Sequence, residues 1–246
     1  MQPVLFKVRG VEVHAYPAFL FLGLTFGVIA GTAVGSARGL DAVRLQAALL
    51  ILIVPALVGS RLLYVLTHWR FYLEHRSLVW SRQEGGAALY GGLLLALMCS
   101  WPAVRVFGLS LGAFWDAATI TILVGMILTK IGCLLNGCCA GRETSGWFGF
   151  NLPDTHGIRR RRVPVQLLES ALAALLLAGA LSWTTRPFDG ALFLAALTGY
   201  GAARLALEST RETVDRIAGF SVYRMISLML VAGSIATYAA VWWTRS

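Results

Sequence analysis

Seven long apolar runs limit what this chain can fold into. They cover roughly residues 16–36, 43–67, 87–107, 112–135, 165–184, 189–210 and 221–243. A run of about 20 apolar residues crosses the hydrocarbon of a bilayer as a helix. Strands of a membrane barrel are shorter and alternate polar with apolar residues, which these runs do not. The sequence therefore predicts an all-α, polytopic membrane protein with about seven transmembrane helices.

The amino-acid composition argues against a soluble domain in this chain. Hydrophobic residues make up 57% of the chain and charged residues 13%, whereas soluble domains carry about 25% charged residues. The longest polar stretch, residues 136–164, is too short to bury a core of its own. We therefore expect one integral membrane domain over residues 1–246, with residues 136–164 as an external loop within it.

Arginine carries almost all of the positive charge. The formal net charge is +9, and the only lysines are Lys7 and Lys130. Arginine binds phosphate and carboxylate groups through parallel hydrogen bonds, and loop arginines also meet lipid headgroups at the bilayer surface. The basic residues do not gather on a soluble face, so nucleic acid is not an expected partner, whereas the membrane is.

A charged side chain inside an apolar run is costly without a partner or a task. Arg61 lies in the second run, and Asp116 and Lys130 lie in the fourth. Asp116 and Lys130 are about 21 Å apart along a helix, so they cannot pair with each other. Arg61 needs a carboxylate or phosphate partner, or a side-chain path to the membrane interface.

The end of the fourth run is the most informative stretch. The helix that carries Lys130 continues into Asn136-Gly-Cys-Cys-Ala-Gly-Arg142, which is too small and polar to continue in lipid. Glycines here allow the backbone to approach another group closely. We expect this helix to end at a site and to direct polar groups at a ligand.

Three charges near the end of the sixth run share one helix face. Arg204, Glu208 and Arg211 are spaced i, i+4 and i+7. A glutamate between two arginines orients both and leaves one guanidinium for a phosphate. The same spacing also suits a purely structural ion triad, and the residues alone do not separate the two.

Cysteines gather beside the central stretch. Cys133, Cys138 and Cys139 do not form a CxxC pair, and no histidine lies at ligand spacing. The pattern therefore predicts no metal site. A disulfide or a reactive thiol is the alternative if this end of the protein faces an oxidising space.

Taken in order, these pieces resemble the prolipoprotein diacylglyceryl transferase family of bacterial membrane enzymes. The likeness runs from about Tyr16 to about Ala232. It rests on residues 13–16, 59–64, 85–93, 130–142, 164–169 and 199–211, together with Asp116. Each piece alone is weakly specific, whereas the ordered set with seven apolar runs is fairly specific.

The chain departs from the family signature at several positions. The family motif opens Gly-Arg-x-Gly-Asn-Phe, whereas here the arginine position is Lys130 and the asparagine position is Cys133. The family's His-Gly-Gly becomes Tyr90-Gly-Gly, and an acidic position of the motif becomes Cys138. The resemblance therefore indicates a divergent member.

The resemblance implies a transferase of the bacterial cytoplasmic (inner) membrane whose active site faces outward. Such an enzyme moves a diacylglyceryl group from phosphatidylglycerol, or another anionic phospholipid, to the lipobox cysteine of a prolipoprotein signal peptide and forms a thioether, with no cofactor. The implied catalytic residues are Lys130, Arg204, Tyr90 and Tyr16. The implied substrate-binding residues are Lys130, Asn136, Gly141, Arg142, Glu208, Arg211, Asp116 and Arg61.

Two other interpretations stay open. Because the departures fall at the expected chemistry, a non-catalytic or repurposed protein that binds lipid or lipoprotein is one alternative. Lys130 and Cys133 share a helix face, so a related group transfer through a cysteine thiolate is the other. The count of arginines in the connecting loops also favours the reverse membrane orientation by the positive-inside rule.

Overall fold

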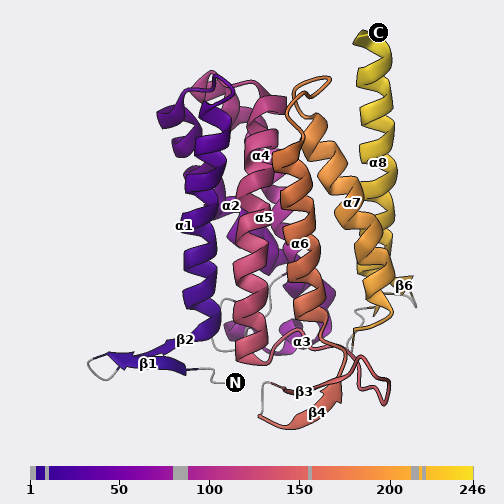
Figure 1. The fold of residues 1–246 in the computed structure, drawn as a ribbon. Helices are drawn as coiled ribbons and strands as arrows, with labels where there is room; N and C mark the ends of the chain where they lie inside the picture. The colour runs from indigo at the N-terminus through magenta and orange to yellow at the C-terminus, as the bar shows by residue number, and fades with distance from the viewer. Residues whose placement is uncertain are drawn as a thin grey trace.

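The computed structural model describes residues 4–8, 11–79, 88–154, 157–211, 216–217 and 220–245. Within these residues seven long helices lie side by side as a bundle (Figure 1). They are α1 (Ala15–Ser36), α2 (Ala42–Thr67), α4 (Leu89–Phe107), α5 (Leu111–Asn136), α6 (Val165–Ser182), α7 (Ala191–Glu208) and α8 (Val222–Arg245). All seven are long and apolar enough to cross a membrane, which confirms the predicted polytopic architecture. Residues 85–87 of the glycine-rich motif lie outside the described residues.

Short elements connect these helices. The helix α3 (Trp69–Glu74) and the 3-10 helix η1 (Arg76–Leu78) follow α2. Three antiparallel hairpins pair β1 (Val4–Val8) with β2 (Val11–His14), β3 (Phe150–Pro153) with β4 (Arg159–Arg162), and β5 (Arg216–Ile217) with β6 (Phe220–Ser221). They lie at one end of the bundle, beside the start of α1 and the end of α5 (Figure 1), which we call the hairpin end. The all-α prediction did not include these hairpins, because it rested on long apolar runs and their strands are only two to five residues long.

Glycines bring pairs of helices into close contact. A Cβ atom added to Gly27 of α1 would lie 2.6 Å from the carbonyl oxygen of Thr121 in α5, closer than real side chains approach. Gly59 of α2 and Gly91 of α4 face each other's carbonyl groups in the same way. Small residues permit such close approach between membrane helices. These contacts place α1 against α5, the helix that carries Lys130, and α2 against α4.

Local signals determine where α5 begins and ends. The Ser110 side chain accepts a hydrogen bond from the Ala113 N–H at 3.4 Å and caps the first turn. Gly137 ends the helix in the left-handed conformation with φ 75°, and the Cys138 N–H donates back to the Cys133 carbonyl at 3.1 Å. This turn folds the following loop back over the end of α5.

Large apolar side chains remain exposed on the outer faces of the helices. Phe21, Val54, Leu175 and Met229 are between 64% and 73% exposed, although they lie on four different helices. Exposed large apolar side chains on so many helices are unusual for a soluble monomer. In a bilayer the same surface faces acyl chains, which agrees with seven membrane-spanning helices.

Candidate active site

Five charged side chains from three parts of the chain meet near the hairpin end. We call them the ion network: Lys130 of α5, Glu169 of α6, Arg204 and Glu208 of α7, and Arg211, which follows α7. Glu169 forms an ion pair with Lys130. The Glu169 Oε1 atom accepts a hydrogen bond from Arg211 Nη1 at 3.3 Å and lies 3.7 Å from Arg204 Nη1. Arg204 Nη1 also lies 2.9 Å from Glu208 Oε2.

The ion network is buried and carries a net positive charge. The side chains of Glu169 and Glu208 are 1% and 2% exposed, and that of Arg204 is 6% exposed. Charges at this depth are costly unless they are paired. Three cations face two carboxylates, which leaves one positive charge in excess. A phosphate group complements such an arrangement.

Aromatic rings line one side of the ion network. The Arg204 guanidinium lies 5.7 Å from the centre of the Tyr223 ring, and the Tyr90 ring lies 6.2 Å from the rings of both Tyr200 and Tyr223. Tyr90 is only 2% exposed. Its hydroxyl shares a 2.5 Å hydrogen bond with the Ser227 hydroxyl, which joins α4 to α8. Tyr90 is therefore held rigidly beside the charges.

The loop after α5 is attached to the end of α7 through its backbone. Gly141 pairs with Arg211 in an isolated β-bridge, and the Arg142 N–H donates to the Thr210 carbonyl at 2.8 Å. A Cβ atom at Gly141 would collide with the Val163 carbonyl oxygen, so a glycine is required there. The Arg142 side chain is exposed. Gly141 and Arg142 therefore contribute to the site by positioning the loop.

Tyr16 and Asn136 lie at the end of α5 that follows Lys130. Tyr16, in the first turn of α1, packs over Gly132 of α5, where an added Cβ would lie 3.4 Å from the Tyr16 Cα. Lys130 is among the charged neighbours of the Tyr16 hydroxyl. Asn136 is the last residue of α5, and its side chain lies within hydrogen-bonding reach of the Cys138 thiol. Both residues thus border the cysteines.

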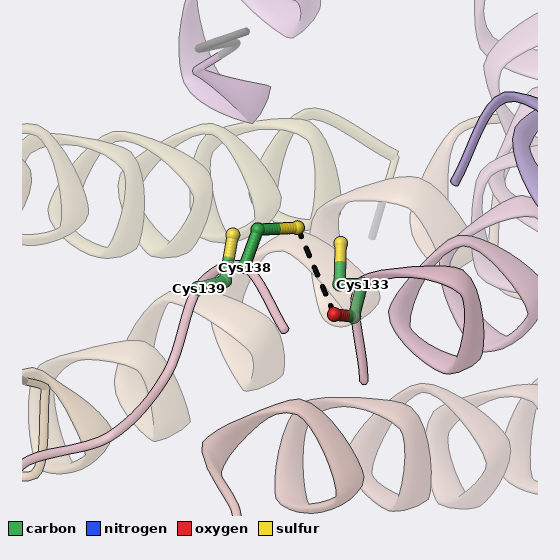
Figure 2. A group of neighbouring side chains, drawn as sticks. All are labelled: Cys133, Cys138 and Cys139. Atoms are coloured by element: carbon green, nitrogen blue, oxygen red, sulfur yellow. Dashed lines mark hydrogen bonds between the residues drawn. The ribbon is translucent and has the colours of Figure 1, made fainter. Parts of the chain in front are cut away.

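The three cysteines that are clustered in the sequence also converge in the structure. The Sγ atoms of Cys133, Cys138 and Cys139 all lie within 4.8 Å of one another. Figure 2 shows the three sulfur atoms side by side, with Cys133 on the end of α5 and the other two on the loop. Gln166 of α6 donates from Nε2 to the Cys138 carbonyl at 2.8 Å and so anchors this loop. We call the three residues the thiol group.

The thiol group opens from the interior toward the surface. Cys133 is buried, Cys138 is partly buried and Cys139 is exposed. The pKa of Cys139 lies well below its usual value, because the thiols of Cys133 and Cys138 hydrogen-bond to its thiolate and the charges of Lys130 and Arg211 are close. The thiol group therefore borders the ion network on its outer side.

Two further sequence-predicted binding residues form hydrogen bonds with residues other than those of the ion network. Asp116 is near the opposite end of α5, where it accepts hydrogen bonds from Arg186 at 3.2 Å and from the Phe193 N–H at 3.0 Å. Arg61 donates to the backbone carbonyls of Leu78 and Val79 at 3.0 and 2.8 Å. Asp116 therefore joins α5 to the segments that carry Arg186 and Phe193, far along α5 from Lys130. Arg61 joins α2 to η1 and the residue that follows it.

Glu169 is the central residue that sequence reasoning did not select. It belongs to a stretch that supports the family resemblance, yet its role depends on contacts with Lys130 and Arg211, which lie on other segments. The available signal was an acidic residue within the first turns of an apolar run. Tyr200 was missed as well, because an aromatic residue in such a run is usually ordinary packing.

The sequence is similar to known proteins over nearly its whole length. The sequence model of the family described as "Prolipoprotein diacylglyceryl transferase" matches residues 3–241. A protein of Dehalococcoides mccartyi named phosphatidylglycerol–prolipoprotein diacylglyceryl transferase is 28% identical over 243 residues, covering 94% of this chain and 90% of that protein. A protein of the same name from Streptococcus pyogenes serotype M5 is 24% identical over 237 residues, with coverages of 94% and 92%. The chain therefore belongs to the prolipoprotein diacylglyceryl transferase family.

Proposed function

We propose that this protein transfers a diacylglyceryl group from phosphatidylglycerol to a cysteine thiol of a prolipoprotein. The thiolate sulfur attacks the glyceryl carbon that carries the phosphate, a C–S bond forms and the C–O bond to phosphate breaks. The electron pair leaves with glycerol phosphate, and the product is a thioether. The names of the relatives and the extent of the family match support this reaction.

The observation that carries the proposal is the buried ion network with its excess positive charge. A leaving phosphate gains negative charge as the C–O bond breaks, and fixed cations in a site of low dielectric stabilise that charge. Arg204 presents a planar fork of donors for two phosphate oxygens. Lys130 supplies a second positive charge from the neighbouring helix. Donor binding is therefore assigned to these two residues.

The carboxylates position the cations. Glu208 fixes Arg204 by a contact of 2.9 Å, and the Ser221 hydroxyl donates to Glu208 at 3.0 Å. Glu169 pairs with Lys130 and Arg211. Preorganised side chains need little rearrangement in the transition state, which is the usual source of electrostatic catalysis.

The remaining candidates are assigned by their places around the ion network. Tyr90 is buried and bonded to Ser227, which suits a positioning group better than a proton acceptor. Tyr16 borders the thiol group and is assigned to the acceptor side. Asn136 ends α5, and Gly141 pairs with Arg211. These two residues are assigned to positioning the loop after α5 between the two substrates.

We further propose that the protein resides in the bacterial cytoplasmic membrane with the hairpin end outward. Both substrates are anchored in that membrane, so a site placed between helices suits lateral diffusion of lipid and signal peptide. The count of loop arginines opposes this orientation by the positive-inside rule. Loops that bind anionic lipid headgroups hold basic residues for that function, which supports the outward orientation despite the count.

Transfer by the purified protein tests the proposal. The full chain, in vesicles that contain phosphatidylglycerol with a labelled diacylglyceryl group, is given a lipobox peptide. Arg204→Ala should lower transfer by about a hundredfold to a thousandfold, the typical cost of removing one transition-state donor. Arg105→Ala is the control, because Arg105 lies near the opposite end of α4 over the Trp101 ring. Normal transfer by Arg204→Ala would reject the assignment of Arg204.

The same assay separates the proposed enzyme from a lipid-binding relative. A protein that binds phosphatidylglycerol yet transfers nothing to any lipobox peptide would support the non-catalytic alternative. Rescue of a bacterium depleted of its own diacylglyceryl transferase, read from the gel shift of a reporter lipoprotein, would contradict that alternative.

A further inference from the structure

We propose that Cys133, Cys138 and Cys139 bind a zinc ion, and that the fourth coordination position of this ion takes the acceptor thiol. The second part rests on the transfer reaction proposed above, whereas the metal site itself does not.

The geometry of the thiol group suits three zinc ligands. Zinc–sulfur bonds of about 2.3 Å in a tetrahedron place the sulfur atoms about 3.8 Å apart. The three Sγ atoms already lie within 4.8 Å of one another, so small side-chain rotations complete the arrangement. Among the residues that the structure describes, no fourth cysteine, histidine or carboxylate joins this group. Three protein ligands with one open position are typical of catalytic zinc sites, whereas structural sites are closed by four.

A disulfide explains the arrangement less well. Neighbouring Cα atoms across a trans peptide are about 3.8 Å apart, which is shorter than disulfides normally require, so Cys138 and Cys139 are poor partners. A bridge between Cys133 and Cys138 would leave Cys139 unused. Cys139 holds its position in a left-handed conformation with φ 58°, which is uncommon for a residue other than glycine. That backbone conformation, with the Gln166 hydrogen bond to Cys138, fixes the loop so that all three sulfur atoms converge.

The surroundings of the thiol group favour a divalent, thiophilic ion. Thiolates select zinc or Cu(I) over Mg²⁺ and Ca²⁺, and zinc is the one of these two that normally takes a fourth ligand. Three thiolates around Zn²⁺ carry one negative charge in excess. Lys130 and Arg211 are the charged neighbours of Cys139 and offset that excess. The exposed side of Cys139 leaves access for an incoming thiol.

The zinc ion would supply the thiol activation that the transfer reaction needs. An acceptor thiol that replaces water on zinc loses its proton to bulk water and is held as a thiolate. The thiolate sulfur then attacks the glyceryl carbon, the C–O bond to phosphate breaks, and the neutral thioether leaves the zinc ion without any redox change. Tyr90 does not fill this role, because its hydroxyl is engaged with Ser227. The thiol group lies next to Lys130, so the bound thiolate would face the donor phosphate.

Metal content of the full chain, purified in detergent without chelators, tests the site directly. We expect about one zinc ion per chain, and cobalt substitution should give the thiolate-to-cobalt absorption of a tetrahedral sulfur site. Each of Cys133→Ser, Cys138→Ser and Cys139→Ser should lower the zinc content at least about tenfold. Cys99→Ser is the matched control, because Cys99 lies in α4 outside the thiol group and should leave zinc binding unchanged.

Three results would overturn the site. One is protein whose thiols are all reduced and which binds no zinc when zinc is supplied. Another is a disulfide between Cys133 and Cys138 in the isolated protein, found by mass spectrometry. The third is Cu(I) retained in preference to zinc. Thermal unfolding of the serine variants, compared with Cys99→Ser, separates lost ligands from lost folding.

Chelation separates the metal inference from the proposed function. Protein stripped of zinc should lose transfer at least about tenfold and regain it when zinc is returned. Transfer at the full rate without zinc would overturn the role in thiol activation and leave the transferase function standing. Bound zinc in a protein that transfers nothing would overturn the transferase function and leave the metal site standing.

Discussion

Glu169 of α6 forms an ion pair with Lys130 of α5 across the centre of the site, and the Glu169 side chain is only 1% exposed. The same carboxylate accepts a hydrogen bond from Arg211 and lies beside Arg204. One buried acid therefore holds three cations that come from two other segments. The loss of its charge should affect all three at once.

Glu169→Gln should destabilise the protein and abolish transfer. Removing one partner of a buried ion pair costs about 3–5 kcal/mol of unfolding free energy, because the remaining charges are left uncompensated. Unfolding measured in detergent, together with transfer by the folded fraction, checks both effects. Glu12→Gln is the control, because its ion pair with Lys7 is largely exposed on both sides and should cost less than about 1 kcal/mol. Full activity of Glu169→Gln would contradict the proposed role.

Lys130 should tolerate replacement by arginine but not by methionine. Methionine keeps much of the length and removes the charge, so Lys130→Met should lower transfer at least about a hundredfold. Lys130→Arg keeps the charge and adds a second donor for phosphate, and it should retain transfer within about tenfold of the unchanged protein. Initial rates of transfer, measured in vesicles with several contents of phosphatidylglycerol, test both variants. If the Lys130→Met protein were as active as the unchanged protein, the charge of Lys130 would have no role in transfer.

Tyr90 and Ser227 should behave as a coupled pair. Tyr90→Phe and Ser227→Ala each break the 2.5 Å hydrogen bond between α4 and α8. The double variant should be little worse than either single one, because the interaction is already lost. Transfer should fall by less than about tenfold with an unchanged pH profile between about pH 6 and pH 9. Loss of one limb of that profile in Tyr90→Phe would instead identify Tyr90 as a proton acceptor.

Asp116→Asn should lower stability without lowering the activity of the folded protein. The side chains of Asp116 and Arg186 are 6% and 4% exposed, so breaking their pair should cost about 3–5 kcal/mol, as for Glu169. The pair lies far along α5 from Lys130, so transfer per folded molecule should stay within about twofold. If the folded Asp116→Asn protein specifically lost phosphatidylglycerol binding, Asp116 would be a substrate-binding residue after all.

Several features of the fold and of the site could be predicted from the sequence. The apolar runs predicted all seven helices because crossing a bilayer demands length and apolarity, which are local properties. The end of α5 before Gly137 followed from a change to small and polar residues. The shared face of Arg204, Glu208 and Arg211 followed from helical spacing, and the structure places all three in the ion network.

The features of the site that the sequence did not predict depend on contacts between distant segments. Asp116 was expected at the substrate, but its partner Arg186 is 70 residues away, and no local pattern links them. Glu169 pairs with Lys130 because α6 packs against α5, and this packing is not visible in the sequence around Glu169. The convergence of the three cysteines depends on a left-handed turn at Gly137 that folds the loop back. Spacing rules for metal ligands assume simple local geometry and do not anticipate such a turn.

The described residues form seven membrane-spanning helices, which is an odd number. The start of the first helix and the end of the last helix therefore lie at opposite ends of the bundle. The start of α1 lies at the hairpin end, near the ion network, whereas α8 ends at Arg245 on the far side (Figure 1). A fluorescent or enzymatic reporter attached after α8 would therefore read the compartment opposite the site. The sidedness of the chemistry can thus be established in living cells without altering any residue near the substrates.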